Sequence, residues 1–158
     1  MTPARRAVPE DAEELVRLRK IMLDSMRPSD DVDWQQPALE TLRSQLGYEG
    51  SELTAFVVDD PGGSGRLAAC AAGMTQRGLG GPGNPSGVSA HIFNVCTDPG
   101  HRRQGYSRAC MEALLAWYEE RDVRRVDLLA TADGEPLYAS LGFARTAAPS
   151  MRVTLGRN

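Results

Sequence analysis

The residues best suited to chemistry lie within 94–107, where an apolar run ends, turns at Asp98-Pro99-Gly100 and opens into a helical pattern. The first backbone N–H groups of a helix lack partners, so those of residues 103–107 should converge at the positive end of the helix dipole. Gly105 lets a ligand approach the backbone closely. Three arginines add positive charge, namely Arg102, Arg103 and Arg108. The segment predicts an anion site, and a pyrophosphate fits it better than a single carboxylate.

The same residues also suit a plain loop and a solvated helix start, because charge at helix ends usually has no further role. The small Ser107 leaves room beside Gly105, which favours a ligand without requiring one. The residues alone leave both interpretations open.

Composition limits what else the chain could do. Its 158 residues suit one domain, and 41% hydrophobic with 25% charged residues is typical of a globular protein. A formal net charge of -3 gives no general attraction to nucleic acid. The three cysteines and two histidines are too few and too widely spaced for a disulfide framework or a zinc or iron site. We therefore expect no metal and no nucleic-acid partner.

The sequence also predicts no membrane partner. No apolar run reaches the length of a membrane span. The first residues carry some positive charge but lead into an acidic stretch, where a signal peptide would need an apolar one. A cytoplasmic location is the expectation.

Periodicity predicts the elements that must position the turn. Helices are expected from Pro9 to Met26, about Pro37 to Leu46, Gly105 to Arg121 and Glu135 to Ser140. Strands are expected at Leu53–Asp59, Arg66–Gly73, Val88–Thr97, Val126–Ala130, Phe143–Ala147 and Met151–Leu155, with the first two paired antiparallel through a Gly-rich loop. The order is that of a mixed α/β fold without internal repeats.

Two motifs in this order resemble those of a known family. Arg102-x-x-Gly105-x-Ser107 is similar to the Gln/Arg-x-x-Gly-x-Gly/Ala acyl-CoA motif of the GNAT superfamily of N-acetyltransferases. Pro136 to Phe143 contains a Tyr-x-x-Leu-Gly-Phe segment that resembles the second signature of the family. The departure is Ser107, where Gly or Ala is usual. Together the motifs cover residues 88–145.

The resemblance implies a fold and an acetyl-CoA site. The fold is a mostly antiparallel sheet with a splayed parallel pair of strands, flanked by helices and forming one domain over 1–158. Acetyl-CoA would bind by its pyrophosphate at Arg102, Arg103, Gln104, Gly105, Tyr106 and Ser107. The backbone of Val95 and Thr97 would bond the pantetheine arm, with Cys96 between them pointing away. Cys96 also suits a merely buried position.

The resemblance implies an N-acetyltransferase that acts on a primary amine of a small molecule or peptide. Tyr138 would be the general acid that protonates the departing thiolate; its alternative role is a core aromatic. His91 precedes Arg102 by an offset at which some family members place a catalytic glutamate, and an imidazole can deprotonate an ammonium group. Asn94, on the opposite strand face if alternation is regular, could order a water or the carbonyl. For His91 and Asn94, a structural hydrogen bond remains the alternative.

The acceptor is predicted only by charge. Asp30, Asp31 and Asp33 cluster beside Trp34 after the first helix, which suits a cationic amine. Capping and solubility explain the same aspartates. Two other functions stay open: a non-catalytic acyl-CoA sensor, and an interaction domain with a coincidental motif. A homodimer is compatible with the resemblance, but no residue establishes it.

Overall fold

A five-stranded sheet organises the protein in the computed structural model, which describes residues 3–156. The strands lie in sequence order: β1 (Arg5–Arg6), β2 (Leu53–Asp59), β3 (Leu67–Arg77), β4 (Val88–Thr97) and β5 (Val126–Leu128). All neighbours pair antiparallel except β4 and β5, which are parallel. The mixed α/β fold with a parallel pair in a mostly antiparallel sheet is thus confirmed.

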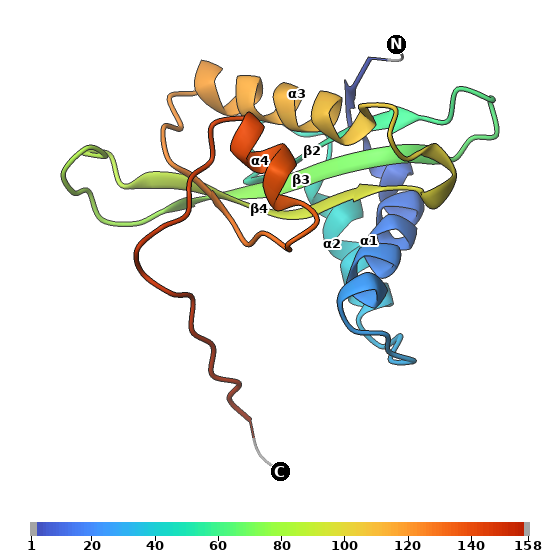
Figure 1. Ribbon diagram of the computed structural model, residues 1–158, viewed down its shortest axis with the longest axis horizontal. Coiled ribbons are helices and arrows are strands. Elements are labelled where there is room, and N and C mark those ends of the chain that lie inside the picture. Colours follow the sequence, from blue (N-terminus) through green and yellow to red (C-terminus); the bar gives the residue numbers. More distant parts are fainter. Residues whose placement is uncertain (1–2, 157–158) are drawn as a thin grey trace.

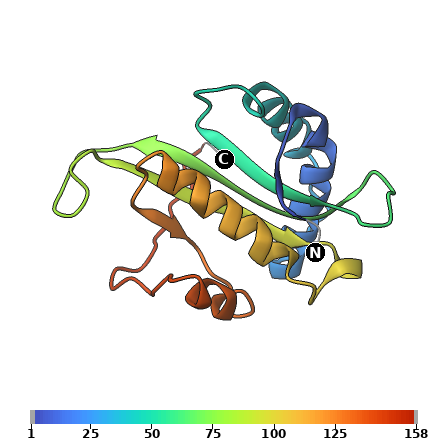
Figure 2. The same ribbon diagram turned by 90° about the horizontal axis from the view of Figure 1, so that it is seen from above.

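Helices cover both faces of this sheet (Figure 1). The helices are α1 (Ala12–Met26), α2 (Gln35–Gln45), α3 (Tyr106–Glu120) and α4 (Glu135–Ser140), with 3₁₀ turns η1 (Pro9–Asp11) and η2 (Pro99–His101). Seen from above, α3 lies over the strands with α4 beside it, and α1 and α2 lie beyond the sheet (Figure 2). The helix boundaries expected from periodicity agree within about two residues.

Apolar side chains of the sheet form one core on each face. Under α3, the strands contribute Ala71, Ala90 and Ile92 to a cluster with Met111 and Leu114. Under α1, another cluster contains Leu15, Leu18, Val57, Cys70 and Cys96. Because strand side chains alternate between faces and both faces are covered, β2 and β3 are buried on both sides. The alanine-rich run of β3 allows close approach of the helices.

A bulge in β4 changes which face its side chains occupy. Gly73 of β3 pairs with Ile92, whereas its neighbour Ala72 pairs with Asn94, so Phe93 is an extra residue in β4. A Cβ atom on Gly73 would lie 2.4 Å from the Tyr118 hydroxyl and 3.0 Å from the His91 carbonyl oxygen. Glycine is therefore required where α3 packs beneath the bulge.

Beyond the bulge, β4 separates from β5. Their pairing is confined to Ala90, His91 and Ile92 of β4 against Val126, Asp127 and Leu128 of β5. β4 runs on to Thr97, whereas β5 ends at Leu128, short of the expected Ala130. The two parallel strands are splayed at the end where β4 leads into the turn before α3.

The strands expected at Phe143–Ala147 and Met151–Leu155 are wrong for the single chain. Beyond Phe143 the chain is exposed and forms an extended segment that runs away from the body (Figure 1). Met151, Val153 and Leu155 are 90%, 76% and 87% exposed. A strand needs a partner for its backbone groups, and this segment has none within residues 3–156.

Within residues 3–156, none of the helices combines the length and the apolar character needed to cross a membrane.

Candidate functional site

The turn between β4 and α3 has an unusual backbone. Asp98 begins it by accepting a hydrogen bond from the Gly100 amide at 2.9 Å. Arg103 and Gly105 then adopt left-handed conformations, with φ of 65° and 78°. This region favours glycine, and Gly105 takes it directly before the first residue of α3. These conformations let the chain turn from β4 into α3.

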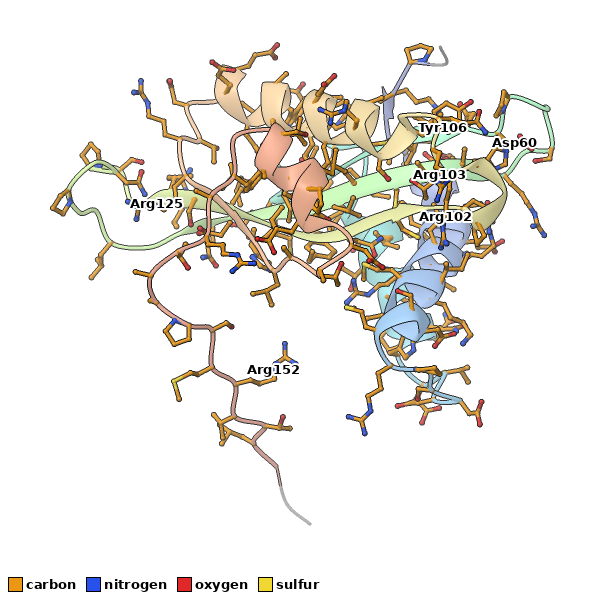
Figure 3. The ribbon with its side chains drawn as sticks, in the orientation of Figure 1. Asp60, Arg102, Arg103, Tyr106, Arg125 and Arg152 are labelled. Carbon is orange, nitrogen blue, oxygen red and sulfur yellow. The ribbon has the colours of Figure 1, made fainter. Side chains whose placement is uncertain are left out.

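These amides are available to a ligand. In the described part of the chain, no hydrogen-bond acceptor is found for the backbone N–H groups of residues 103–107. They lie at the positive end of the α3 dipole, and the side chains of Arg102 and Arg103 are exposed beside them. Figure 3 shows both arginines with Tyr106 and Asp60 at the same end of the sheet. The arrangement suits a ligand with several anionic oxygens.

An ion-pair network fixes the start of the turn. Arg17 of α1 donates to the Asp98 carboxylate at 2.6 Å and to Glu14 at 2.8 Å. Glu14 in turn accepts the Leu67 amide of β3 at 2.8 Å. Burial alone would raise the pKa of both carboxyls, but hydrogen bonds from Arg17 and from backbone amides outweigh it and hold each pKa below its ordinary value. The network joins α1, β3 and the turn.

Two further contacts tie the turn to its surroundings. His101 is hydrogen-bonded through Nε2 to Asp60 of the β2–β3 loop at 3.0 Å. The Ser107 hydroxyl is hydrogen-bonded to that of Thr97, which links the start of α3 to the end of β4. The serine that departs from the family motif therefore stays small at the turn and adds a contact.

A cavity of about 660 Å³ leads from this turn along the splay between β4 and β5. Its lining combines Arg102 and Ser107 of the turn with Val95 and Thr97 of β4. From the end of β5 through α4 it is lined by Leu128, Leu129, Thr131, Asp133, Gly134, Leu137 and Tyr138. α1 closes another side. A smaller cavity of about 440 Å³ near Trp117 contains none of the turn residues.

Tyr138 reaches the cavity from α4. Its ring packs edge-on against Phe143 at 6.0 Å between centroids. A Cβ atom on Gly134 would lie 2.9 Å from the Tyr138 ring, so the glycine makes room for it. Burial raises the pKa of the Tyr138 phenol, which keeps its proton at neutral pH. The hydroxyl is thus available as a proton donor.

His91 and Asn94 differ in access to the cavity. The bulge places both on the face covered by α1, since His91 pairs with Met74 and Asn94 with Ala72. The expectation that they lie on opposite faces is therefore wrong, because the extra residue resets the alternation. His91 lines the cavity. Asn94 is 3% exposed, its amide nitrogen lies 3.6 Å from the Cys70 sulfur, and its Oδ1 has no partner within residues 3–156.

The cysteines are buried thiols. Cys96 belongs to the core under α1, and its sulfur lies 3.7 Å from the Thr97 carbonyl oxygen. Burial raises its pKa to about 11 and that of Cys110 to about 12. Neither thiol is ionised near neutral pH, so neither has the character of a nucleophile.

The acidic loop lies away from this site. Asp30, Asp31 and Asp33 are exposed between α1 and α2, and none of them lines the cavity. Asp31 accepts the Asp33 amide at 2.9 Å, and the Trp34 indole donates to the Asp31 carbonyl at 3.1 Å. These bonds stabilise the loop itself. A role of the loop in acceptor binding stays a prediction.

Several cavity residues were not anticipated from the sequence. Arg19, Met22 and Met26 reach it from α1, Phe93 from the bulge and Arg152 from the C-terminal segment. Arg19 did carry a signal: it lies at helical spacing between Leu15 and Met22, so a charge interrupts an apolar stripe. No comparable signal marks Phe93 or Arg152, whose positions depend on long-range packing.

Comparison with known families identifies the family of this chain. The sequence profile of the Acetyltransferase (GNAT) family matches residues 15–143, which include the turn, the cavity strands and Tyr138. This chain belongs to the GNAT family. It is an acetyltransferase, and acetyl-CoA is the co-substrate that this family assignment supports. No match is found among curated proteins.

Solved structures with this GNAT fold align over nearly the whole chain. A predicted acetyltransferase from Clostridium acetobutylicum, solved with acetyl-CoA, has 22% identity and a TM-score of 0.83 over 97% of this chain and 96% of the other. A GCN5-related N-acetyltransferase from Ralstonia eutropha has 24% identity and a TM-score of 0.79, with 97% and 99% covered. Glucosamine-6-phosphate N-acetyltransferase from Arabidopsis thaliana has 18% identity and a TM-score of 0.72, with 97% and 98% covered.

Proposed function

We propose that this GNAT protein transfers an acetyl group from acetyl-CoA to a primary amine by direct attack in a ternary complex. The observation that carries the proposal is the continuity of one cavity, which joins the unpaired amides at the start of α3 to the hydroxyl-bearing side chain of Tyr138. An anion site at one end and a proton donor at the other suit the two ends of the donor molecule.

The donor is held in three places. The amides of residues 103–107, with Arg102 and Arg103, bind the pyrophosphate. The pantetheine arm lies in the splay, where the backbone of Val95 and Thr97 is not paired with β5. This placement brings the thioester to the part of the cavity lined by Tyr138. Residues 3–156 contain no group of metal-binding side chains, and no step of the proposal uses a metal.

The chemistry then needs only proton transfers beside the bond changes. His91 accepts a proton from the ammonium group, directly or through water, and leaves a neutral amine. The amine nitrogen forms a bond to the carbonyl carbon, and the carbon–sulfur bond breaks. Tyr138 donates its proton to the departing thiolate and recovers one from the new amide nitrogen. The products are the acetylated amine, the coenzyme A thiol and one proton.

Calorimetry with coenzyme A tests the donor site through Ser107. In a Ser107→Glu variant the new carboxylate lies at the second position of α3, where a helix tolerates it, yet it competes with the phosphates for the same amides. We expect affinity to fall at least about tenfold. Ser107→Ala, which restores a residue usual in the family motif, is the control that should bind normally. Equal affinity in both variants contradicts the donor site.

Thiol release from acetyl-CoA tests transfer itself. A panel of amino acids, amino sugars, diamines and peptides should contain at least one acceptor that releases thiol in a protein-dependent manner. Coenzyme A binding without thiol release for any amine would contradict catalysis and support the non-catalytic sensor.

The same proposal gives Asn94 the role of ordering a water molecule or the substrate carbonyl. Asn94→Ala should then lower turnover even under conditions where the variant is fully folded.

We also propose a homodimer. Met151, Val153 and Leu155 alternate along the extended C-terminal segment and expose their apolar side chains. Leu129, just after the edge strand β5, is 61% exposed. Apolar side chains in such a row are typical of a contact surface. A second copy of the chain is the partner that this proposal assigns to them.

A further inference from the structure

Arg19 is the one charged side chain of the α1 stripe that faces the cavity. Met22 and Met26 follow it on the same helix face, and all three line the cavity. Helical spacing places Leu15, one turn earlier, in the buried core. A guanidinium thus occupies a position where the pattern of the helix calls for an apolar residue, at the end of the stripe that opens toward His91 and Phe93.

The surroundings of Arg19 leave its charge unbalanced. Its guanidinium lies 5.6 Å from the centre of the Phe93 ring and donates to the Phe93 carbonyl at 3.4 Å, which is a long hydrogen bond. Within residues 3–156, no carboxylate lies at ion-pair distance from it. Arg17, on the same helix, pairs with both Glu14 and Asp98. Burial lowers the pKa of Arg19, whereas its ion pairs raise that of Arg17.

Arg19 is half-buried, and half-burying a guanidinium without a carboxylate partner costs desolvation free energy. An apolar residue at this position would pack without that cost. The other charged residues that line the cavity are also mostly positive. Arg102 lies at the donor turn, Arg152 reaches in from the C-terminal segment, and Asp133 is the one acidic residue among the described lining residues. Figure 3 shows the Arg152 side chain directed from that segment toward the side of α1.

We propose that Arg19 binds a carboxylate carried by the acceptor, so that the substrate class is small amino acids or closely related amino carboxylates. This inference rests on the proposed function and specifies its acceptor. A planar guanidinium binds a carboxylate through two parallel hydrogen bonds. One such group matches one negative charge, and Phe93 and Met22 beside it suit a short apolar part. His91 lines the same cavity and would receive the proton of the amine.

Steady-state kinetics with matched acceptors test the proposal. Amino acids are compared with their uncharged amides, so that only the carboxylate differs. In Arg19→Met, KM for the amino acids should rise about 30-fold, while KM for the amides and for acetyl-CoA stays unchanged. Arg19→Lys should recover part of the loss, because it keeps the charge without the planar fork. Arg43→Met removes an exposed arginine outside the cavity and should leave each of these KM values unchanged.

Direct binding separates this proposal from the proposed function. Calorimetry of amino acids with the coenzyme A complex needs no turnover, so loss of their binding in Arg19→Met supports the carboxylate site even if no thiol is released. If amino sugar phosphates bind more tightly than amino acids and lose affinity in Arg19→Met, then Arg19 binds a phosphate and the carboxylate assignment is wrong. Preference for amides or diamines over amino acids would overturn the role of Arg19.

Discussion

At the scale of single residues, two tyrosines have contrasting environments. Tyr138 faces the cavity, whereas the Tyr118 hydroxyl is buried against Gly73 without a hydrogen-bond partner within residues 3–156. Burial raises the pKa of both phenols. Only the hydroxyl of Tyr138 can therefore reach a departing thiolate.

Tyr138→Phe should lower kcat about 100-fold and leave KM for acetyl-CoA nearly unchanged. The ring and its packing against Phe143 remain, and only the proton donor is lost. Tyr118→Phe is the matched control. It should keep full activity and an equal or higher melting temperature, because it removes a buried hydroxyl that makes no hydrogen bond. Unaltered kcat in Tyr138→Phe with a good acceptor would remove this tyrosine from the mechanism.

His91→Ala should replace the acidic limb of the pH–rate profile by one that follows ionisation of the acceptor amine. A general base accepts a proton only in its neutral form, so a variant without the base should lose the pH dependence that the base imposes on turnover. Without the ring, the remaining activity should be low and should follow the supply of neutral amine alone. A variant profile with the wild-type acidic limb would assign that limb to another group.

At the scale of elements, the Arg17 network determines how firmly α1 and β3 hold the turn. Arg17→Met leaves the partly buried carboxylates of Glu14 and Asp98 without their cation, and we expect a loss of about 2 kcal/mol of unfolding free energy. Arg43→Met breaks an exposed pair with Glu13 and should change stability by less than about 1 kcal/mol. Urea unfolding measures both.

The acid dependence of stability should change with the same variant. In the wild type, both carboxyls have a pKa below the ordinary values of 4.5 and 3.8, so their stabilisation is present above those values and is lost as pH falls through the folded pKa. In Arg17→Met the hydrogen bonds from Arg17 are lost while burial remains, so the pKa of each carboxyl should rise from its wild-type folded value. The stabilisation lost on acidification should therefore be smaller in the variant than in the wild type. Equal losses in both proteins would contradict the role of the network.

The acidic loop between α1 and α2 suits a cationic acceptor, in contrast to the amino carboxylate assigned to Arg19. If Asp30, Asp31 and Asp33 attract a cationic amine, changing all three to Asn should raise KM for diamines at low salt and leave KM for acetyl-CoA unchanged. The effect should shrink as salt is added. If KM for the best acceptor is unchanged in this variant, the aspartates have no role in acceptor binding and only stabilise their own loop.

At the scale of the whole molecule, the C-terminal segment is separable from the fold. Few side-chain contacts hold it beyond the Arg145–Glu135 ion pair and the position of Arg152 at the cavity. Removing residues 148–158 should leave the melting temperature of the folded body within a few degrees of wild type and convert a dimer to a monomer. Light scattering coupled to gel filtration gives the mass of each.

A full-length variant distinguishes the loss of the exposed apolar side chains from the deletion of the whole segment. Met151, Val153 and Leu155 changed together to Ser should also yield a monomer while keeping Arg152 in place. A wild-type protein that is already monomeric at high concentration would contradict the proposed dimer. A dimer that survives both changes would place the interface elsewhere on the molecule.

Local patterns predicted the parts of this protein that depend on neighbouring residues. The apolar stripe of α3, the breaks at Asp98-Pro99 and the glycine at 105 follow from helix period and backbone freedom, and the structure has them where they were expected. The motif at Tyr138 coincides with α4 as predicted. Each of these features is decided within a few residues of chain, so composition and spacing suffice.

Contacts between distant segments decided the rest. The extra residue at Phe93 lies opposite Gly73 of β3, which packs on Tyr118 of α3, and no local signal in β4 marks it. That bulge determines that His91 and Asn94 share a face, and the packing of α1 on β4 brings Arg19 to the cavity. The residues after Phe143 have the alternation of strands, yet they lack a neighbouring edge to bond. Periodicity predicts which face of an element a residue occupies. Whether that face is buried, and whether a strand forms, depends on the neighbouring strand or helix that tertiary packing supplies.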